Sequence, residues 1–346
     1  MEILKKIYTF RLAAKKDSKA IMLFIKKFWL NNHILGQNKK FFNYQYKNKS
    51  KYNFIIAINK KNSNIDAIQG FIPYTKKIQN EHICGSVTLV RPGIKIPYLG
   101  IWVMKKMLEI TKPKTYCGIG TNPKTMKPLV ERFFSRITGK MNHFYFLNEN
   151  KSKFSIAKVG KKKKKKFKKN KIHIIELKEF SELKKFFNFN KKYKYLPYKD
   201  KWYLKKRYFE HPFFKYKFFL LDREYLLVGK EKFYRNSKIL TYVDYVGEMK
   251  LLKNLGCLTN DLILKNNYEY VDMLCNKDIS KILKISGFSK KSFKDKNIIP
   301  IYFEPFVRKN VEIIYEMDQD KIYFKADADQ DTPRLSNLYK KIKTLK

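Results

Sequence analysis

Residues 83–109 place a strand, a glycine-bearing loop and a helix one after another, an order that can hold a phosphate group. The strand is expected over residues 83–90, where β-branched residues accompany leucine before Arg91-Pro92-Gly93 ends the run. A helix is expected to begin near Leu99, where apolar residues start to recur at helical spacing. The first backbone N–H groups of a helix have no internal partner and lie at the positive end of its dipole. This stretch therefore predicts an anion site.

Two aspartates interrupt apolar, strand-like runs further along the chain. Asp244 lies in TYVDYVGE and Asp272 lies in YEYVDMLC. A carboxylate buried in such a run must be paired or must have a raised pKa, and a raised pKa suits a general base. Both are therefore candidate catalytic residues. For each one taken alone, an aspartate at an exposed strand end is the favoured alternative.

Other polar residues lie beside aromatic ones. Arg207 and His211 occur in KRYFEHPFF, and Glu304 occurs in YFEPF. A carbohydrate site needs aromatic platforms together with polar side chains. Glu304 is therefore a further candidate catalytic residue, and Arg207 and His211 are candidate substrate-binding residues. Each of them could equally be a packing or salt-bridge residue.

Asp327, Asp329 and Asp331 have the alternating spacing of the first ligands in a calcium loop. The sixth position is Thr332 instead of glycine and the twelfth is Leu338 instead of glutamate, which excludes an EF-hand. Asp327 and Asp329 are kept as candidates for binding sugar hydroxyls, with an exposed acidic turn as the favoured alternative. The cysteines and histidines show no metal-ligand spacing, so no metal is expected.

Length and composition predict a globular, cytoplasmic protein of two domains. The chain has 346 residues, of which 44% are hydrophobic and 16% aromatic. No apolar run is long enough to cross a membrane, and the N-terminus lacks the apolar core of a signal peptide. The expected domains are residues 1–150 and 176–346. Residues 151–175, which contain GKKKKKKFKKN, are expected to be a lysine-rich linker or loop.

The formal net charge of +47 would ordinarily indicate a nucleic-acid or anionic-membrane partner. Only nine of the 77 basic residues are arginine, although arginine is better suited to bidentate phosphate recognition. The lysines accompany abundant asparagine, isoleucine, tyrosine and phenylalanine, as an AT-rich coding sequence would produce. We interpret the charge as a solvated coat. Salt-sensitive micromolar binding of duplex DNA or tRNA would contradict that interpretation.

The elements that must position these residues predict an α/β arrangement. The first half reads as a helix within residues 12–40, a hairpin of strands 54–58 and 67–73, the 83–109 stretch, strand 115–120, helix 124–134 and strand 143–147. The second half repeats this order loosely, with strands at 217–221, 225–228, 240–246 and 270–274 and helices at 181–187, 199–209, 249–266 and 279–285. The expected fold class is α/β (α+β), each domain having a mixed, mainly antiparallel sheet flanked by helices.

Residues 54–147 resemble the GNAT acyltransferase superfamily, whose members transfer an acyl group from acyl-CoA to an amine or hydroxyl. In that family a loop of the type R/Q-x-x-G-x-G/A and the helix after it bind the pyrophosphate of CoA. Lys95 stands at the leading position and Gly100 matches the last glycine, while Tyr98 replaces the middle glycine, where close backbone approach is wanted. The resemblance implies a CoA site formed by Leu89, Val90, Lys95, Tyr98, Leu99, Gly100, Ile101 and Asn122.

The same resemblance implies a wedge and a catalytic acid. In the family, two strands beside the CoA loop splay apart and seat the pantetheine arm of CoA. Asn122 matches an asparagine near the end of the second of these strands, and its alternative role is a turn residue before Pro123. By analogy with family members, Tyr145 is a candidate acid for the departing thiolate, and its alternative role is a core aromatic residue.

The second half resembles a further, more divergent copy, through Tyr270-Val271-Asp272, a helix and Gly287-Phe288. A tandem of this kind is similar to acyltransferase-like proteins of bacterial surface-polysaccharide gene clusters and to peptidoglycan aminoacyltransferases. The resemblance implies transfer from acetyl-CoA or another acyl-CoA to an amino sugar or similar precursor, such as a nucleotide-linked sugar, without a metal. A tRNA-dependent aminoacyltransferase and a non-catalytic binding protein are the alternatives.

Overall fold

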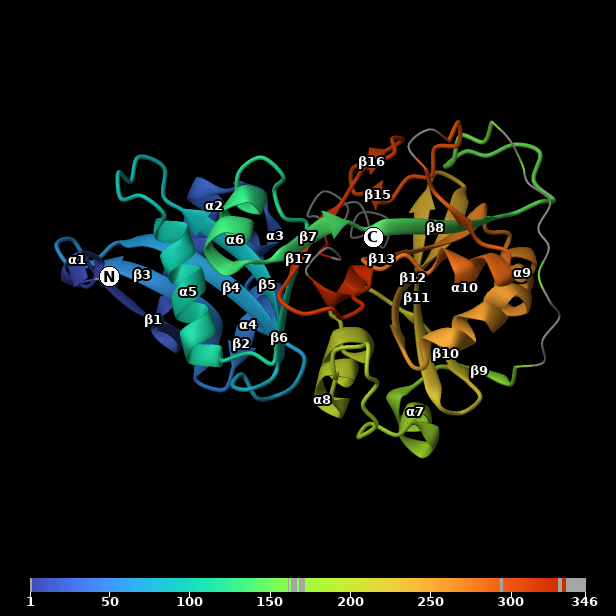
Figure 1. Ribbon diagram of the computed structural model, residues 1–346, viewed down its shortest axis with the longest axis horizontal. Coiled ribbons are helices and arrows are strands. Elements are labelled where there is room, and N and C mark those ends of the chain that lie inside the picture. Colours follow the sequence, from blue (N-terminus) through green and yellow to red (C-terminus); the bar gives the residue numbers. More distant parts are fainter. Residues whose placement is uncertain are drawn as a thin grey trace, which may run out of the picture.

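The computed structural model describes residues 2–160, 162, 167, 172–292, 295–328 and 332–333, and its strands form two large sheets and a small ribbon (Figure 1). The first sheet has the order β1-β3-β4-β5-β6-β17-β7, with β2 beside β3. Its strands are β1 (Tyr8–Ala14), β2 (Lys47–Asn48), β3 (Lys51–Asn59), β4 (Ile65–Pro73), β5 (His82–Val90), β6 (Thr115–Ile119), β7 (Ile137–Lys140) and β17 (Ile314–Met317).

The second sheet has the order β14-β8-β13-β12-β11-β10-β9. Its strands are β8 (Asn142–Leu147), β9 (Ile174–Leu177), β10 (Lys217–Leu221), β11 (Tyr225–Tyr234), β12 (Ser237–Val246), β13 (Tyr270–Cys275) and β14 (Ser289–Lys290), and the ribbon is β15 (Tyr302–Phe303) with β16 (Phe306–Val307). Each sheet contains one parallel pair, β5 with β6 and β12 with β13, among antiparallel ones. The expected class of two mixed, mainly antiparallel sheets flanked by helices is therefore confirmed.

Helices cover both faces of the first sheet because its strands bury apolar side chains in both directions. One face packs against α2 (Ser18–Phe28), α3 (Ile34–Gln37) and α4 (Lys39–Tyr46), and the other packs against α5 (Leu99–Thr111) and α6 (Met126–Phe134). The remaining helices are α1 (Glu2–Ile7), α7 (Phe180–Phe186), α8 (Lys201–Leu204) with a π-helical turn at Lys205–Phe209, α9 (Leu255–Asn266) and α10 (Ser280–Ile285). Within the described ranges, none of these helices is long and apolar enough to cross a membrane.

The two halves exchange strands. β8, expected at the end of the first half, pairs with β13 of the second sheet, and β17, from near the end of the chain, lies between β6 and β7 of the first. Only Met141 separates β7 from β8, so the chain passes directly from one sheet into the other, as the green strands of Figure 1 show. Each sheet therefore contains one strand from the other expected range, 1–150 or 176–346. An apolar alternation predicts that a strand forms, but it does not predict which strand it pairs with.

Candidate functional site

Strands β5 and β6 separate partway along their length. Their parallel pairing runs only from His82 opposite Thr115 to Cys84 opposite Cys117. Beyond those positions β5 continues to Val90 and β6 to Ile119 without pairing to each other. The register of β5 against β4 also shifts there, which marks a bulge and adds local twist. The two strands therefore form a wedge, and among the described residues the backbone of β5 beyond Cys84 has no strand partner on the β6 side.

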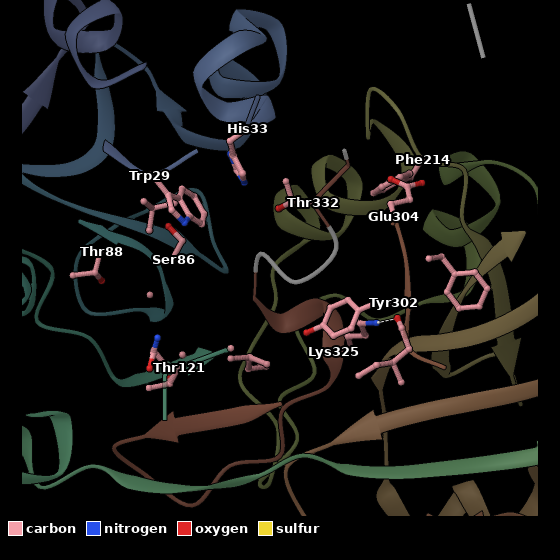
Figure 2. A pocket seen from close by; sticks show the side chains of 18 of the residues that line it. Trp29, His33, Ser86, Thr88, Thr121, Phe214, Tyr302, Glu304, Lys325 and Thr332 are labelled. Atoms are coloured by element: carbon pink, nitrogen blue, oxygen red, sulfur yellow. Dashed lines mark hydrogen bonds between the residues drawn. The ribbon is translucent and has the colours of Figure 1, made fainter. Parts of the chain in front are cut away.

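The wedge opens into a cavity of about 1060 Å³ that both halves line. One wall is formed by residues 85–89 of β5, by residues 118–122, which follow the last pair between β5 and β6, and by Trp29 and His33. The other wall is formed by residues 213–215, 230–233 and 301–304 together with Lys325. Figure 2 shows Trp29, Ser86, Thr88 and Thr121 on one side and Phe214, Tyr302, Glu304 and Lys325 on the other. The cavity thus has room for two reactants that approach from different halves.

Helix α5 begins beside the end of β5, as the sequence predicts. A Cβ atom on Gly100 would lie 3.3 Å from Val90 Cγ2, so the helix start can approach the strand this closely because glycine stands there. Tyr98, at the position of the family's middle glycine, has a φ of 59°, a conformation that favours glycine. Its side chain is 47% exposed and its ring lies 4.9 Å from that of Phe133 on α6.

The candidate CoA residues divide into two groups. Leu89 and Asn122 line the cavity. Val90, Lys95, Tyr98, Leu99, Gly100 and Ile101 belong to the adjoining strand end, loop and helix start and are not among the lining residues. Asn122 Oδ1 accepts hydrogen bonds from the backbone N–H groups of Lys124 and Thr125, at 2.9 and 3.2 Å. Asn122 therefore acts as a turn residue at the edge of the wedge, and that contact occupies its side-chain oxygen.

A tyrosine and a glutamate meet where the strands of the wedge separate. The Tyr116 hydroxyl on β6 donates to Glu316 Oε1 on β17 at 3.0 Å. The pair needs the two glycines around it, because a Cβ on Gly85 would lie 2.1 Å from the Tyr116 hydroxyl and a Cβ on Gly118 would lie 2.6 Å from Glu316 Oε1. Both Tyr116 and Glu316 line the cavity. The pair is therefore a candidate acid–base group at the narrow end of the wedge.

The environment of Glu316 sets its protonation. Its side chain is only 4% exposed, and Oε2 has no hydrogen-bond partner in the part of the chain that the structure describes. Burial raises the pKa of Glu316 to about 6, against the opposing effects of the Tyr116 hydroxyl and the Arg136 guanidinium. Sequence reasoning missed this residue because the short run IIYEM was not recognised as a strand. A short apolar run that contains one glutamate is the signal that could have found it.

Glu304 is the one residue among the four catalytic candidates that lines the cavity. It is half-buried and faces the cavity near Phe214 (Figure 2). Tyr145 lies in the second sheet, where its hydroxyl donates to Asp295 at 3.0 Å and burial raises its pKa to about 12. Neither Tyr145 nor the two strand aspartates line the cavity.

Asp244 and Asp327 share a buried lysine. Lys199 Nζ lies 2.6 Å from Oδ1 of Asp244 and 2.6 Å from Oδ1 of Asp327, and the Tyr208 hydroxyl donates to Asp244 at 2.5 Å. All three charged side chains are buried. Burial raises the pKa of Asp327 to about 6 although Lys199 opposes that rise. The favoured alternatives, an exposed strand end for Asp244 and an exposed turn for Asp327, are therefore wrong, because Lys199 pairs both carboxylates inside the protein.

Asp272 is also buried, so its interpretation as an exposed strand-end residue is wrong as well. Its Oδ2 lies 2.9 Å from His143 Nε2. Burial alone would raise the pKa of Asp272, but the hydrogen bond to His143 and the charge of Lys232 hold it below the ordinary value. A carboxylate kept ionised by these partners is suited to a structural role, although its Oδ1 is buried without a hydrogen-bond partner among the described residues.

The candidate substrate-binding residues hold backbone segments. Arg207 donates to the carbonyl oxygens of Ala326 and Ala328, at 3.3 and 3.0 Å. His211 Nδ1 accepts from the backbone N–H groups of Phe213 and Phe214, at 3.2 and 3.0 Å. These contacts hold in place the backbone at residues 213–214 and 326–328, next to the second wall of the cavity. Asp329 and most of the lysine run lie outside the described residues.

The second sheet has a matching parallel pair, but the chain fills its opening. β12 and β13 pair only from Leu240 opposite Val271 to Tyr242 opposite Met273, and both continue beyond. Residues 322–328 lie between them. Phe324 forms a bridge with Cys275 on β13, and its ring lies 6.3 Å from that of Tyr245 on β12. Segment 322–328 is mostly buried, and it closes the second wedge to a ligand.

Among the described residues, no group of three His, Cys, Asp or Glu side chains could hold a metal ion. No protein-family model matches the chain, and no curated protein matches its sequence.

Solved structures similar to this chain include N-acetyltransferases and an N-myristoyltransferase. A GCN5-related N-acetyltransferase from Anabaena variabilis aligns over 90% of this chain and 72% of its own, with 8% identity and a TM-score of 0.49. One from Sphaerobacter thermophilus aligns over 91% and 96%, with 7% identity and a TM-score of 0.41. N-myristoyltransferase from Saccharomyces cerevisiae, with bound myristoyl-CoA, aligns over 91% and 83%, with 11% identity and a TM-score of 0.43. All three TM-scores are below 0.5, so the activity has to be judged from this chain's own residues.

Proposed function

We propose that the protein transfers an acyl group from an acyl-CoA donor to an amine, and that the donor binds in the wedge between β5 and β6. The observation that carries this proposal is the early end of the β5–β6 pairing at Cys84 and Cys117, which opens into the shared cavity. An extended ligand with amide groups can bond to the unpaired β5 backbone as an added strand would. Helix α5 begins beside Val90, so its N-terminus lies where a pyrophosphate at the wedge would need it.

The first half is the donor-binding half in this proposal. The matching wedge of the second half is filled by segment 322–328, whose Phe324 and Ala326 are fully buried. A donor there would have to displace part of the core. The second half therefore supplies the facing wall of the cavity, and the acceptor binds against that wall.

Acyl transfer needs an acceptor amine that has lost its proton and a proton for the departing thiolate. Tyr116 and Glu316 are placed to do both. The amine proton passes to the Tyr116 oxygen as the Tyr116 proton passes to Glu316, which leaves a neutral amine. The amine nitrogen then attacks the thioester carbon, the C–N bond forms and the C–S bond breaks. The proton on Glu316 returns through Tyr116 to the thiolate sulfur, and the second proton of the original ammonium is released to water.

For the acceptor we propose an amino sugar or a related precursor of a bacterial surface glycan, acylated in the cytoplasm. Aromatic side chains on both walls, Trp29, Phe214 and Tyr302, offer the flat surfaces on which a sugar ring packs. Glu304, on the second wall, is half-buried and would accept hydrogen bonds from the acceptor. Direct transfer requires no covalent enzyme intermediate and no metal.

The donor site is tested by acetyl-CoA binding to a variant in which the wedge is filled. Thr121 follows β6, lines the cavity and is held by a backbone hydrogen bond to Ile314, so Thr121→Trp would place an indole where the arm of the donor lies. We expect calorimetry to show acetyl-CoA binding to the unmodified protein and at least roughly tenfold weaker binding to this variant, a loss of about 1.4 kcal/mol.

The matched control is Thr9→Trp, at an exposed position on edge strand β1, where the same indole should leave the affinity unchanged. Equal affinity of both variants for acetyl-CoA would contradict the wedge as the donor site. No binding of acetyl-CoA to the unmodified protein would contradict the acyl-CoA donor altogether and leave a non-catalytic binding protein as the better interpretation.

A further inference from the structure

Three lysine side chains line the second wall of the cavity. Lys230 and Lys232 are two residues apart on β11, so they share one face of the second sheet, and Lys325 comes from segment 322–328. The exposed fractions are 9%, 9% and 3%. Ammonium groups this deeply buried require compensation, because water no longer solvates them.

Lys232 is the most informative of the three. Its Nζ is buried and has no hydrogen-bond partner among the described residues, although the side chain lines the cavity. Its Nζ lies 5.4 Å from the centre of the Phe303 ring, and its charge lowers the pKa of Asp272. Asp272 is already engaged by His143 at 2.9 Å. An ammonium in this position has donors left for a ligand.

The other two lysines extend the same charged surface. Lys325 donates to the Ile301 carbonyl at 3.1 Å, the dashed contact in Figure 2, and lies 5.8 Å from the centre of the Tyr302 ring. Lys230 Nζ lies 3.0 Å from the centre of the Phe214 ring. These rings hold the ammonium groups against the cavity wall.

Acidic residues on this wall do not neutralise Lys232. Glu231 precedes it on β11 and therefore points to the other face of the strand, where it accepts a hydrogen bond from Tyr268 and lies 3.7 Å from Lys238. Glu304 comes from the turn between β15 and β16 and does not hydrogen-bond to Lys232 Nζ, which has no such partner among the described residues. The wall thus presents cationic groups from β11 and segment 322–328 beside one carboxylate from another element.

We infer that the acceptor carries an anionic group, a phosphate or a carboxylate, which binds to Lys232 with Lys230 and Lys325 around it. This deepens the proposed function and rests on it for the amine end of the acceptor, while the anion site stands on the lysines themselves. The acceptor class narrows from amino sugars in general to amines that also bear a negative charge. An uncharged amino sugar would leave Lys232 Nζ without a hydrogen-bond acceptor in the complex, at a cost to affinity.

The kinetic test uses acetyl-CoA with three amines that share one skeleton: glucosamine, glucosamine 6-phosphate and glucosaminic acid. We expect at least one of the two anionic probes to have a kcat/KM roughly 10- to 100-fold above that of glucosamine. Lys232→Met should abolish that preference through KM, with kcat and the affinity for acetyl-CoA unchanged, and Lys232→Arg should retain it. The phosphate and carboxylate probes distinguish the two sources of charge. Equal use of all three amines, or an equal loss for all three in Lys232→Met, would overturn the inference.

A binding test separates the anion site from the enzymatic proposal. Inorganic phosphate should raise the melting temperature of the unmodified protein and of Lys61→Met, an exposed turn control that keeps the same overall charge as Lys232→Met. The shift should be smaller for Lys232→Met. If no amine is acetylated but this difference appears, the anion site stands and the proposed function falls. Identical phosphate shifts in both variants, an adventitious ion only, would remove the anion site.

Discussion

Replacing Glu316 with glutamine is expected to lower kcat for acetyl transfer by roughly 10²- to 10⁴-fold, the range that a positioned acid–base group contributes. The amide oxygen can still accept the Tyr116 hydroxyl hydrogen bond, which spans 3.0 Å in the unmodified protein. The amide cannot take up a proton, so the proton of the Tyr116 hydroxyl has no acceptor. Because Glu316 belongs to β17 and not to the unpaired edge of β5, the affinity for acetyl-CoA should be unchanged.

The raised pKa of Glu316 predicts how kcat/KM should change with pH. Only the ionised carboxylate accepts a proton, and its pKa is raised to about 6 by burial. In the unmodified protein kcat/KM should therefore rise as pH increases through about 6 and level off above that value. Glu316→Gln should lack this limb, and Tyr116→Phe should lower kcat in the same direction.

The control for the Glu316 experiment is Glu109→Gln on the exposed side of α5, where Glu109 forms an ion pair with Lys106 at 3.0 Å. It should keep both the rate and the pH profile. Release of free CoA thiol, followed across pH, measures all of these variants. A Glu316→Gln protein with the unmodified rate and profile would remove Glu316 from the mechanism.

Replacing Lys199 with methionine is expected to destabilise the protein by about 3–5 kcal/mol, the usual cost of removing one partner from a buried ionic group. The variant leaves Asp244 and Asp327 facing each other in the core without the ammonium that lies 2.6 Å from each. Segment 322–328 would lose its tie to β12, and with it the packing that fills the second wedge. Urea unfolding followed by tryptophan fluorescence measures the change in midpoint.

The loss of folding stability in Lys199→Met should become smaller as pH falls. Lys199 opposes the rise that burial causes in the pKa of Asp327, so without Lys199 that pKa should rise further above its unfolded value of about 3.9. The folded state then binds protons more tightly than the unfolded state, so the destabilisation is largest at neutral pH and shrinks as pH falls through the raised pKa. Adding Asp244→Asn and Asp327→Asn should recover part of the stability at neutral pH.

Lys201→Met, two residues away and exposed, is the control for Lys199→Met and should change stability by no more than about 0.5 kcal/mol. A Lys199→Met protein as stable as this control would show that the buried group contributes little. A loss that did not vary with pH would point to lost packing of the lysine stem, because only the charge effect responds to protonation.

Parts of the wedge could be predicted because they follow from local chemistry. Pro92 removes a ladder donor and Gly93 permits a turn, so β5 ends at Val90. The apolar spacing after Gly100 sets a helix, and α5 begins at Leu99. The hairpin of β3 and β4 was predicted in the same way from its polar turn. The burial of Asp244 and Asp272 was considered but not favoured, because the partners Lys199 and His143 lie on other segments.

The sequence by itself determined most of the longer strands and helices, since dihedral preference, turn chemistry and side-chain periodicity act over a few residues, whereas strands β1 and β17 were not predicted. The tertiary structure alone decided which strands pair, that β8 and β17 cross between the sheets, and that segment 322–328 fills the second wedge. It also brought Glu316 to Tyr116, 200 positions away along the chain. Contacts at that separation depend on how the whole core packs, and no local rule carries that information. Local rules therefore predicted the start of α5, whereas only the packed sheets placed Glu316 beside Tyr116 as a candidate acid–base group.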